Sequence, residues 1–209
     1  MHSLVKKILC CIFAAIIMAM FLAGCSSPQN HIRPANLTSE QRDLLDFITT
    51  HNSEILLFDF ATSKPFETIE FWLETYEYGV LVDSIHSVHV TSFQEFNRGT
   101  LEGQLAVLIN SNRENGNLDF QYTFIVELDG TRAHHTVQSS TAGDDALWGI
   151  SSAVSEPVYI QNGSEIILYL SKFSGDGLRT IGDLQDFAQQ PELLAEYPYV
   201  HMIKARFSR

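Results

Sequence analysis

Residues 119–139 read DFQYTFIVELDGTRAHHTVQS, and this stretch decides the fold class. Apolar and aromatic side chains recur in it at every second position, at Phe120, Tyr122, Phe124, Val126 and Leu128. A period of two places all of them on one face of a β-strand. Asp129-Gly130 is typical of a two-residue hairpin turn and leads into a second strand over 131–139. The stretch therefore predicts an antiparallel hairpin with one buried face.

Short segments of the same kind, rich in β-branched and aromatic residues and separated by turn residues, follow one another from residue 54 onward. We expect strands at 55–60, 68–78, 80–82, 84–92, 104–110, 119–128, 131–139, 158–160, 165–170 and 199–207. A helical apolar stripe predicts an N-terminal helix over 37–52 that packs on a sheet or covers its edge. Residues 183–196 regain helical character, broken by Pro191.

Because helices do not alternate with these strands, the pattern predicts a mainly β chain folded as an antiparallel β-sandwich, Ig-like or related. A short helix would precede the sandwich strands and a short helical segment would precede the last strand. No internal repeat and no second domain boundary is visible, so we expect a single sandwich domain over residues 37–209.

The segment 68–78 fits two structures. Apolar side chains alternate along it as in a strand, at Ile69, Phe71 and Leu73. The spacing of Ile69, Trp72, Leu73 and Tyr76 also fits a helical stripe, but the β-branched and aromatic content favours the strand. In the strand, Trp72, Tyr76 and Tyr78 point outward among Glu70 and Glu74. They would form an exposed aromatic strip able to bind a protein or a sugar ring, unless a second layer covers them.

Composition excludes several classes of protein. The chain has 209 residues, 13 Lys and Arg against 25 Asp and Glu, and a net charge of −12. The acidic balance argues against nucleic-acid binding, and 45% hydrophobic residues argue against disorder. The three cysteines are Cys10, Cys11 and Cys25, so the body after residue 25 has neither a disulfide framework, nor a thiolate metal cluster, nor a cysteine nucleophile.

The N-terminal segment has the features of a targeting signal. Lys6 and Lys7 precede an apolar run of 16 residues over 8–23, which is short for a bilayer span of about 20 residues and suits the apolar region of a signal peptide. The run ends in Leu22-Ala23-Gly24-Cys25, which resembles the lipobox of bacterial lipoproteins. An uncleaved membrane anchor is the alternative, and in both cases the body is held at a membrane.

The resemblance implies a signal peptide over 1–24, cleavage before Cys25 and attachment of a diacylglycerol, with its two acyl chains (palmitate included), to the Cys25 thiol. The polar residues 25–36, with Pro28 and Pro34, are expected to be a tether. The mature chain would keep 185 residues with a side-chain charge of −14, because Lys6 and Lys7 leave with the signal peptide. It would be extracytoplasmic and anchored by lipid to the bacterial cell membrane.

Catalytic motifs are missing from the sequence. The body after residue 25 contains no G-x-S-x-G, S-x-x-K or H-E-x-x-H pattern, and no P-loop, so we expect neither an enzyme, nor a bound metal, nor a cofactor. His86 and His89 are three residues apart and His134 and His135 are adjacent. On regular strands the members of each pair point to opposite faces, so a catalytic site would need one histidine from each pair and a carboxylate.

Three functions stay open. The chain is most simply a non-enzymatic binding or protein-interaction domain of the cell envelope, with Trp72, Tyr76 and Tyr78 as contact residues for an envelope protein or a glycan. The second is an envelope hydrolase with a cross-strand histidine–carboxylate site. The third is a structural subunit of an envelope assembly.

Overall fold

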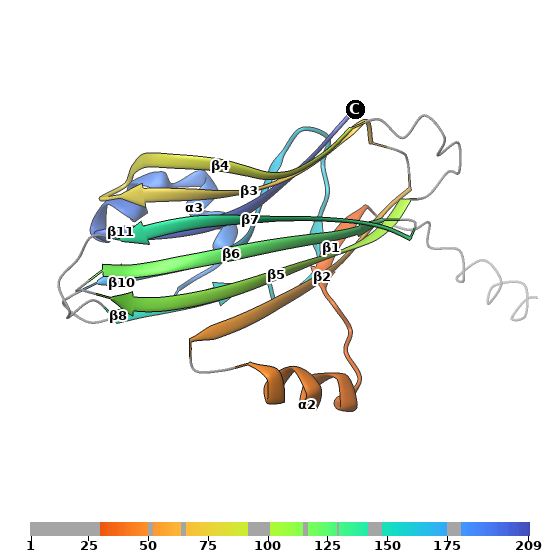
Figure 1. Ribbon diagram of the computed structural model, residues 1–209. Coiled ribbons are helices and arrows are strands. Elements are labelled where there is room, and N and C mark those ends of the chain that lie inside the picture. Colours follow the sequence, from red (N-terminus) through yellow and green to blue (C-terminus); the bar gives the residue numbers. More distant parts are fainter. Residues whose placement is uncertain are drawn as a thin grey trace, which may run out of the picture.

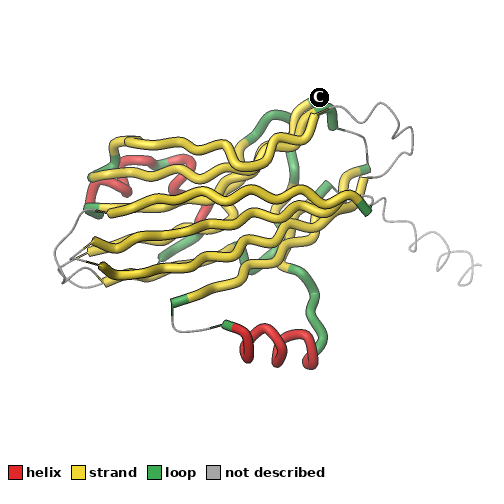
Figure 2. Tube along the Cα trace, viewed as in Figure 1, coloured by secondary structure: helices red, strands yellow, loops and turns green. Residues whose placement is uncertain are grey.

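The computed structural model describes residues 30–49, 52–63, 66–91, 101–114, 117–128, 130–141, 148–174 and 181–209. These residues form two antiparallel sheets that pack face to face, so the predicted antiparallel β-sandwich is confirmed (Figures 1 and 2). The helices are few and short. They lie outside the two sheets, as expected for a mainly β chain.

The first sheet has six strands in the order β7-β6-β5-β2-β1-β9. Its strands are β1 (His31–Pro34), β2 (Ser53–Thr62), β5 (Leu101–Glu114), β6 (Asn117–Leu128), β7 (Thr131–Thr141) and β9 (Val158–Tyr159). The hairpin predicted from residues 119–139 is β6–β7, with Leu128 opposite Thr131 at its turn. Gly130 adopts a φ of +77° there, a backbone angle that glycine reaches without steric cost.

The second sheet has five strands in the order β4-β3-β11-β10-β8. Its strands are β3 (Thr68–Glu77), β4 (Val80–Thr91), β8 (Trp148–Ala153), β10 (Glu165–Ser174) and β11 (Tyr199–Ser208). The segment 68–78 is therefore a strand and not a helix. Tyr78 and Gly79 form its tight turn into β4 with φ angles of +46° and +79°. Strand β8 is absent from the sequence prediction.

The core lies between the sheets and is built from aromatic rings at one end. The ring of Phe207 on β11 lies 5.6 Å from the rings of Phe60 and Phe66 and 6.2 Å from that of Phe71. Edge-to-face contacts of this kind stabilise a core beyond the area they bury. Alternate residues of β6 also point inward, as predicted, and Tyr122 and Phe124 are completely buried.

Helix α2 (Ser39–Ile48) forms where a helix is expected, and Thr38 and Gln41 close a capping box at its start. The expectation that it packs on a sheet or covers its edge is wrong, because none of its residues is buried. The reason is β1, which pairs with β2 from His31 opposite Ala61 to Pro34 opposite Phe58 and so occupies the edge that the helix was expected to cover. Figure 1 shows α2 standing beyond the edge of β2.

Strand β1 also corrects the predicted tether over 25–36. Residues 31–34 belong to the first sheet, and Ile32 is completely buried in the core. The tether prediction missed them because two prolines and polar neighbours surround a single apolar residue. Cys25 and the signal peptide 1–24 lie outside the described residues.

The predicted helical segment before the last strand is confirmed as α3 (Leu184–Gln189) followed by the 3-10 helix η1 (Pro191–Glu196). Both contribute buried side chains to the core cluster, namely Leu184, Phe187 and Leu194. The amide side chain of Gln185 accepts a hydrogen bond from the backbone N–H of Ile167 and donates one to its carbonyl, at 3.4 and 2.8 Å. These two bonds satisfy the backbone N–H and C=O of Ile167, at a position of β10 that β8 does not reach, because β8 pairs with β10 only from Tyr169 onward.

Candidate functional site

The predicted aromatic strip is exposed only at one end. Phe71 and Leu73 are buried in the core, so Trp72 lies on the outer face of β3 as expected. Its side chain is nevertheless only 1% exposed, and the prediction of an exposed Trp72 is wrong. Tyr76 is half-buried, and Tyr78 in the turn is 66% exposed.

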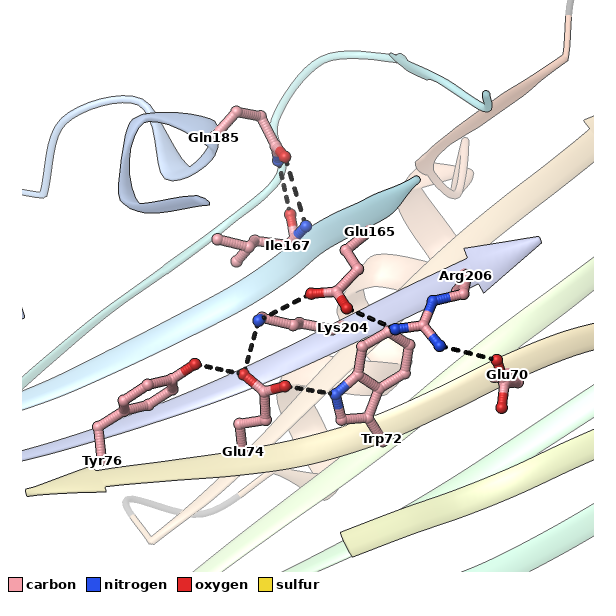
Figure 3. Close-up of polar contacts among 9 residues, drawn as sticks. All are labelled: Glu70, Trp72, Glu74, Tyr76, Glu165, Ile167, Gln185, Lys204 and Arg206. Carbon is pink, nitrogen blue, oxygen red and sulfur yellow. Dashed lines mark hydrogen bonds and ion pairs between the residues drawn. The ribbon is translucent and has the colours of Figure 1, made fainter. Parts of the chain in front are cut away.

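Charged side chains from neighbouring strands cover Trp72. The guanidinium of Arg206 on β11 lies 5.0 Å from the centre of the Trp72 ring, within the range of a cation–π contact. The imidazole of His86 on β4 stacks on the ring at 5.6 Å and 17°. The indole N–H donates a 2.8 Å hydrogen bond to Oε1 of Glu74 (Figure 3). Among the described residues, side chains of the same sheet therefore cover this ring.

Glu74 is the centre of a network of ion pairs and hydrogen bonds (Figure 3). Its Oε2 accepts a hydrogen bond from the Tyr76 hydroxyl and lies 2.6 Å from Nζ of Lys204. Lys204 also donates to Oε2 of Glu165 at 3.1 Å. Arg206 bridges the other oxygen of Glu165 and, at 3.4 Å, the carboxylate of Glu70. Every charged group of this set has a partner, which is what burial of a charge requires.

The network holds its groups in their usual protonation states at neutral pH. Burial and the hydrogen bond to Glu74 raise the pKa of Tyr76 to about 12. Burial alone lowers the pKa of Lys204, but the hydrogen bond and charge of Glu74 outweigh it and raise that pKa. For the carboxyl of Glu165, burial by itself raises the pKa, but the hydrogen bonds and charges of Arg206 and Lys204 outweigh burial and lower that pKa. All three pKa shifts move away from neutral pH, so Tyr76, Lys204 and Glu165 supply no acid or base poised near pH 7.

A β-bulge brings His86 and His89 to the same face, and the prediction that they point to opposite faces is wrong. His89 pairs with Glu70 and His86 with Trp72, two positions along β3 against three along β4. The extra residue is Ser87, whose buried Oγ has no hydrogen-bond partner among the described residues. The Nδ1 atoms of His86 and His89 consequently lie 3.8 and 3.3 Å from Oε1 of Glu70.

The other histidine pair lies elsewhere. His134 and His135 are exposed on β7, in the first sheet. Within the described part of the chain, no hydrogen bond or ion pair links them to His86 or His89. Over the same residues, no group of three His, Cys, Asp or Glu side chains is placed to hold a metal ion.

His201 on β11 is a functional group that the search for paired histidines missed. Its Nδ1 lies 2.7 Å from the hydroxyl of Tyr122, and its Nε2 lies 3.4 Å from Oγ of Ser139. The ring is completely buried against Phe120 and Phe173, and this burial lowers its pKa to about 3. A histidine beside a serine hydroxyl resembles part of a hydrolytic triad. However, so weak a base cannot accept the serine proton at neutral pH.

A separate exposed apolar surface lies at the turn between β3 and β4. Tyr78, Val80, Leu81 and Val82 form this tip patch, with 66%, 64%, 48% and 49% of their surface exposed. The Tyr78 backbone N–H donates to the carbonyls of Tyr197 and Pro198, both at 3.2 Å.

Helix η1 holds the turn rigidly. A Cβ at Gly79 would come within 3.0 Å of the Ala195 backbone, so the turn packs tightly against η1. Acidic residues border the patch, with Glu77 and Asp83 beside it in the sequence and Glu192 on η1, all exposed. The geometry is that of a rigid apolar surface with an acidic rim.

A comparison with known protein families identifies the family of this chain. The family model described as YgaN domain matches residues 31–204, from the first residue of β1 into β11. The chain belongs to the YgaN domain family. The match includes strands of both sheets, the tip patch, and Glu70, Glu74, Glu165 and Lys204 of the network, so these are parts of the YgaN domain itself, and Arg206 lies just beyond the matched residues.

The other comparisons add no relative, since neither a curated protein nor a solved structure matches the chain. In the described part of the YgaN domain chain, no helix is both long and apolar enough to cross a membrane.

Proposed function

We propose that this YgaN domain is a non-enzymatic protein-interaction domain, held outside the bacterial cytoplasmic membrane by lipid on Cys25. The observation that carries the proposal is the tip patch, which exposes four large apolar side chains within residues 78–82. Exposed apolar surface of this kind marks interaction sites on stable proteins. The Leu22-Ala23-Gly24-Cys25 motif supports the anchor.

The groups that could do chemistry favour binding over catalysis. His201 is enclosed by aromatic rings, with a pKa near 3. Lys204 and Glu74 satisfy each other in a buried ion pair. A hydrolase would need a base with a pKa near the working pH, whereas the pKa of His201 is lowered and that of Lys204 is raised, each away from neutral pH.

The tip patch lies at the end of the sandwich away from the anchored N terminus. Asn30 accepts a hydrogen bond from Ile160, at the end where Thr68 of β3 pairs with Ser208 of β11. Strand β3 then runs for 10 residues to the tip, about 30 Å at 3.3 Å per residue. Figure 1 shows the β3–β4 turn at the end opposite the C terminus.

The segment between the anchor and the domain is short. The five residue-to-residue steps from Cys25 to Asn30 span at most about 18 Å. With this tether, the tip patch would point away from the membrane, toward proteins of the envelope.

The rim of the patch determines the chemistry of the partner. Glu77 and Asp83 flank the tip patch in the sequence, and Glu192 is exposed on η1, which packs against the turn, so the complementary surface presents apolar residues together with Lys or Arg. The same acids disfavour anionic lipid as the ligand, because like charges repel. A basic and apolar protein segment fits best.

Capture of partners from native membranes tests the interaction. We compare the wild-type chain with Leu81→Lys, Leu81→Glu and the control Tyr159→Ser, which changes a 56% exposed tyrosine at the other end of the sandwich. We expect wild type and Tyr159→Ser to retain the partner, and Leu81→Lys to lose more of it than Leu81→Glu, because lysine adds repulsion to a basic segment. An identical set of partners for all four chains would refute the proposal.

Inhibition of lipoprotein signal peptidase tests the anchor separately. We expect the larger precursor to accumulate, as it should also in a Cys25→Ser variant. If the chain keeps its mature size and its position in both cases, the assignment of Cys25 is wrong.

A further inference from the structure

Helix α2 has an apolar face that the rest of the described chain leaves uncovered. Leu44, Phe47 and Ile48 are 60%, 86% and 54% exposed, and no residue of the helix is buried. A helix of 10 residues is marginal in water by itself, since most helices shorter than about 12 residues depend on packing of an apolar face. The capping box stabilises its first turn, but a helix this short also needs a surface on which its apolar face can pack.

The outer face of the first sheet carries a matching apolar surface. Leu57, Ala106 and Ile125 lie side by side on β2, β5 and β6, and Ile55 pairs with Leu108 in the next row. All five lie on the side of the sheet away from the core and are partly exposed. We name these five residues the outer strip.

A groove of about 330 Å³ separates the helix from the outer strip. Leu37 and Gln41 line it on the helix side, and Leu57, Ala106 and Ile125 line it on the sheet side. Residues that are three, four and seven positions after Gln41 share its face of the helix, and these are Leu44, Leu45 and Ile48. The apolar face of α2 therefore turns toward a groove whose opposite wall is also apolar.

We propose that a second copy of this chain fills the groove, with the α2 helices of two copies docked reciprocally against each other's outer strips. The same chain carries both complementary surfaces, as a two-fold symmetric interface requires. This interface is independent of the tip patch and of the anchor.

The exposed area favours reciprocal docking over other occupants. The three exposed side chains leave roughly 400 Å² of apolar surface on each helix, since a single aromatic side chain presents about 150–250 Å². Two helix faces and two outer strips together bury about 1,200–1,600 Å², the size of a stable interface. The polar side of α2 bears Glu40, Asp43 and Asp46 against one Arg42, which disfavours an anionic bilayer as the occupant.

Disulfide crosslinking between two tagged full-length copies tests this interface. The chain has no cysteine after Cys25, so an introduced cysteine is the only thiol of the body. One copy carries Phe47→Cys and the other carries Ala106→Cys, and both are expressed together. We expect mild oxidation to yield a disulfide-linked pair with both tags. We expect at least a fivefold smaller yield when Asp46→Cys, on the polar side of α2, replaces Phe47→Cys.

A second variant separates docking from folding. Adding Leu44→Asp to the Phe47→Cys copy should reduce the mixed-tag pair to the level of the Asp46→Cys control, without unfolding the chain, because α2 buries nothing within its own chain. Failure to form the mixed-tag pair would overturn the proposal.

Two further results would assign a different occupant and so also overturn it. A chain that carries both Phe47→Cys and Ala106→Cys and forms only an intrachain disulfide would show that the helix closes on its own sheet. Quenching of a fluorophore on Phe47→Cys by lipid-borne quenchers, without the mixed-tag pair, would show that α2 lies on the bilayer.

Discussion

Acidification is expected to destabilise this domain through His201. The ring is completely buried and its pKa is lowered from 6.5 to about 3, so it is neutral in the folded chain. In the unfolded chain the same ring takes up a proton below pH 6.5. Between these two values the unfolded state binds more protons, so the free energy of unfolding decreases as the pH falls.

The size of the effect follows from the pKa difference. Each pH unit below 6.5 removes about 1.4 kcal/mol from the free energy of unfolding. At pH 5 the loss is therefore about 2 kcal/mol, and it reaches about 5 kcal/mol near pH 3. The full contribution is present above pH 6.5. A loss of this size is a large part of the 5–15 kcal/mol that typically stabilises a domain.

Urea unfolding of wild type and His201→Gln at several pH values between 7 and 5 measures the effect. The variant has no imidazole, whereas Glu54 and Glu165 titrate in both proteins, so the difference between the two pH profiles isolates His201. We expect the variant to be less stable at pH 7, because Tyr122 and Ser139 lose their partner, but to show a shallower pH dependence. Parallel profiles for the two proteins would refute the reasoning.

Three other changes are expected to alter stability, each measured as the shift of the urea midpoint. Trp72→Ala should cost about 3–5 kcal/mol, because a buried ring leaves a cavity, and a near-neutral result would mean that the ring is not packed. Lys204→Met should cost about 3–5 kcal/mol by leaving Glu74 unpaired, whereas the double change with Glu74→Leu should be much milder, and equal losses would contradict a buried pair. Gln185→Ala should cost about 1–3 kcal/mol, since it leaves two backbone groups of Ile167 unsatisfied, and an unchanged midpoint would show that water replaces the amide.

Local periodicity predicted the strands well where a strand has one buried face and a clear turn. Strand β6, with its alternation from Phe120 to Leu128, and the Gly130 turn are the best examples. The pattern failed for β1, because a strand of 4 residues with one buried side chain has too little periodicity to detect. It also missed β8.

The candidate site was harder to predict than the fold. Alternation correctly placed Trp72 on the outer face, but Arg206 and His86, which cover the ring, come from strands β11 and β4. The bulge at Ser87 changed the face of one histidine, because one extra residue reverses every side chain beyond it. On β11 His201 alternates with Ile203, Ala205 and Phe207, which lie in the core, but only the packing of Phe120 and Phe173 around its ring reveals its low basicity.

The sequence by itself determined the mainly β class, the inward and outward faces of the longest strands, and a thiol-free body after Cys25. These properties follow from residue type and local spacing, which do not depend on distant partners. Only the tertiary structure decided which outward side chains meet water, because coverage depends on neighbours far apart in the chain. It buried Trp72 beneath Arg206 and left Tyr78 and the apolar face of α2 exposed.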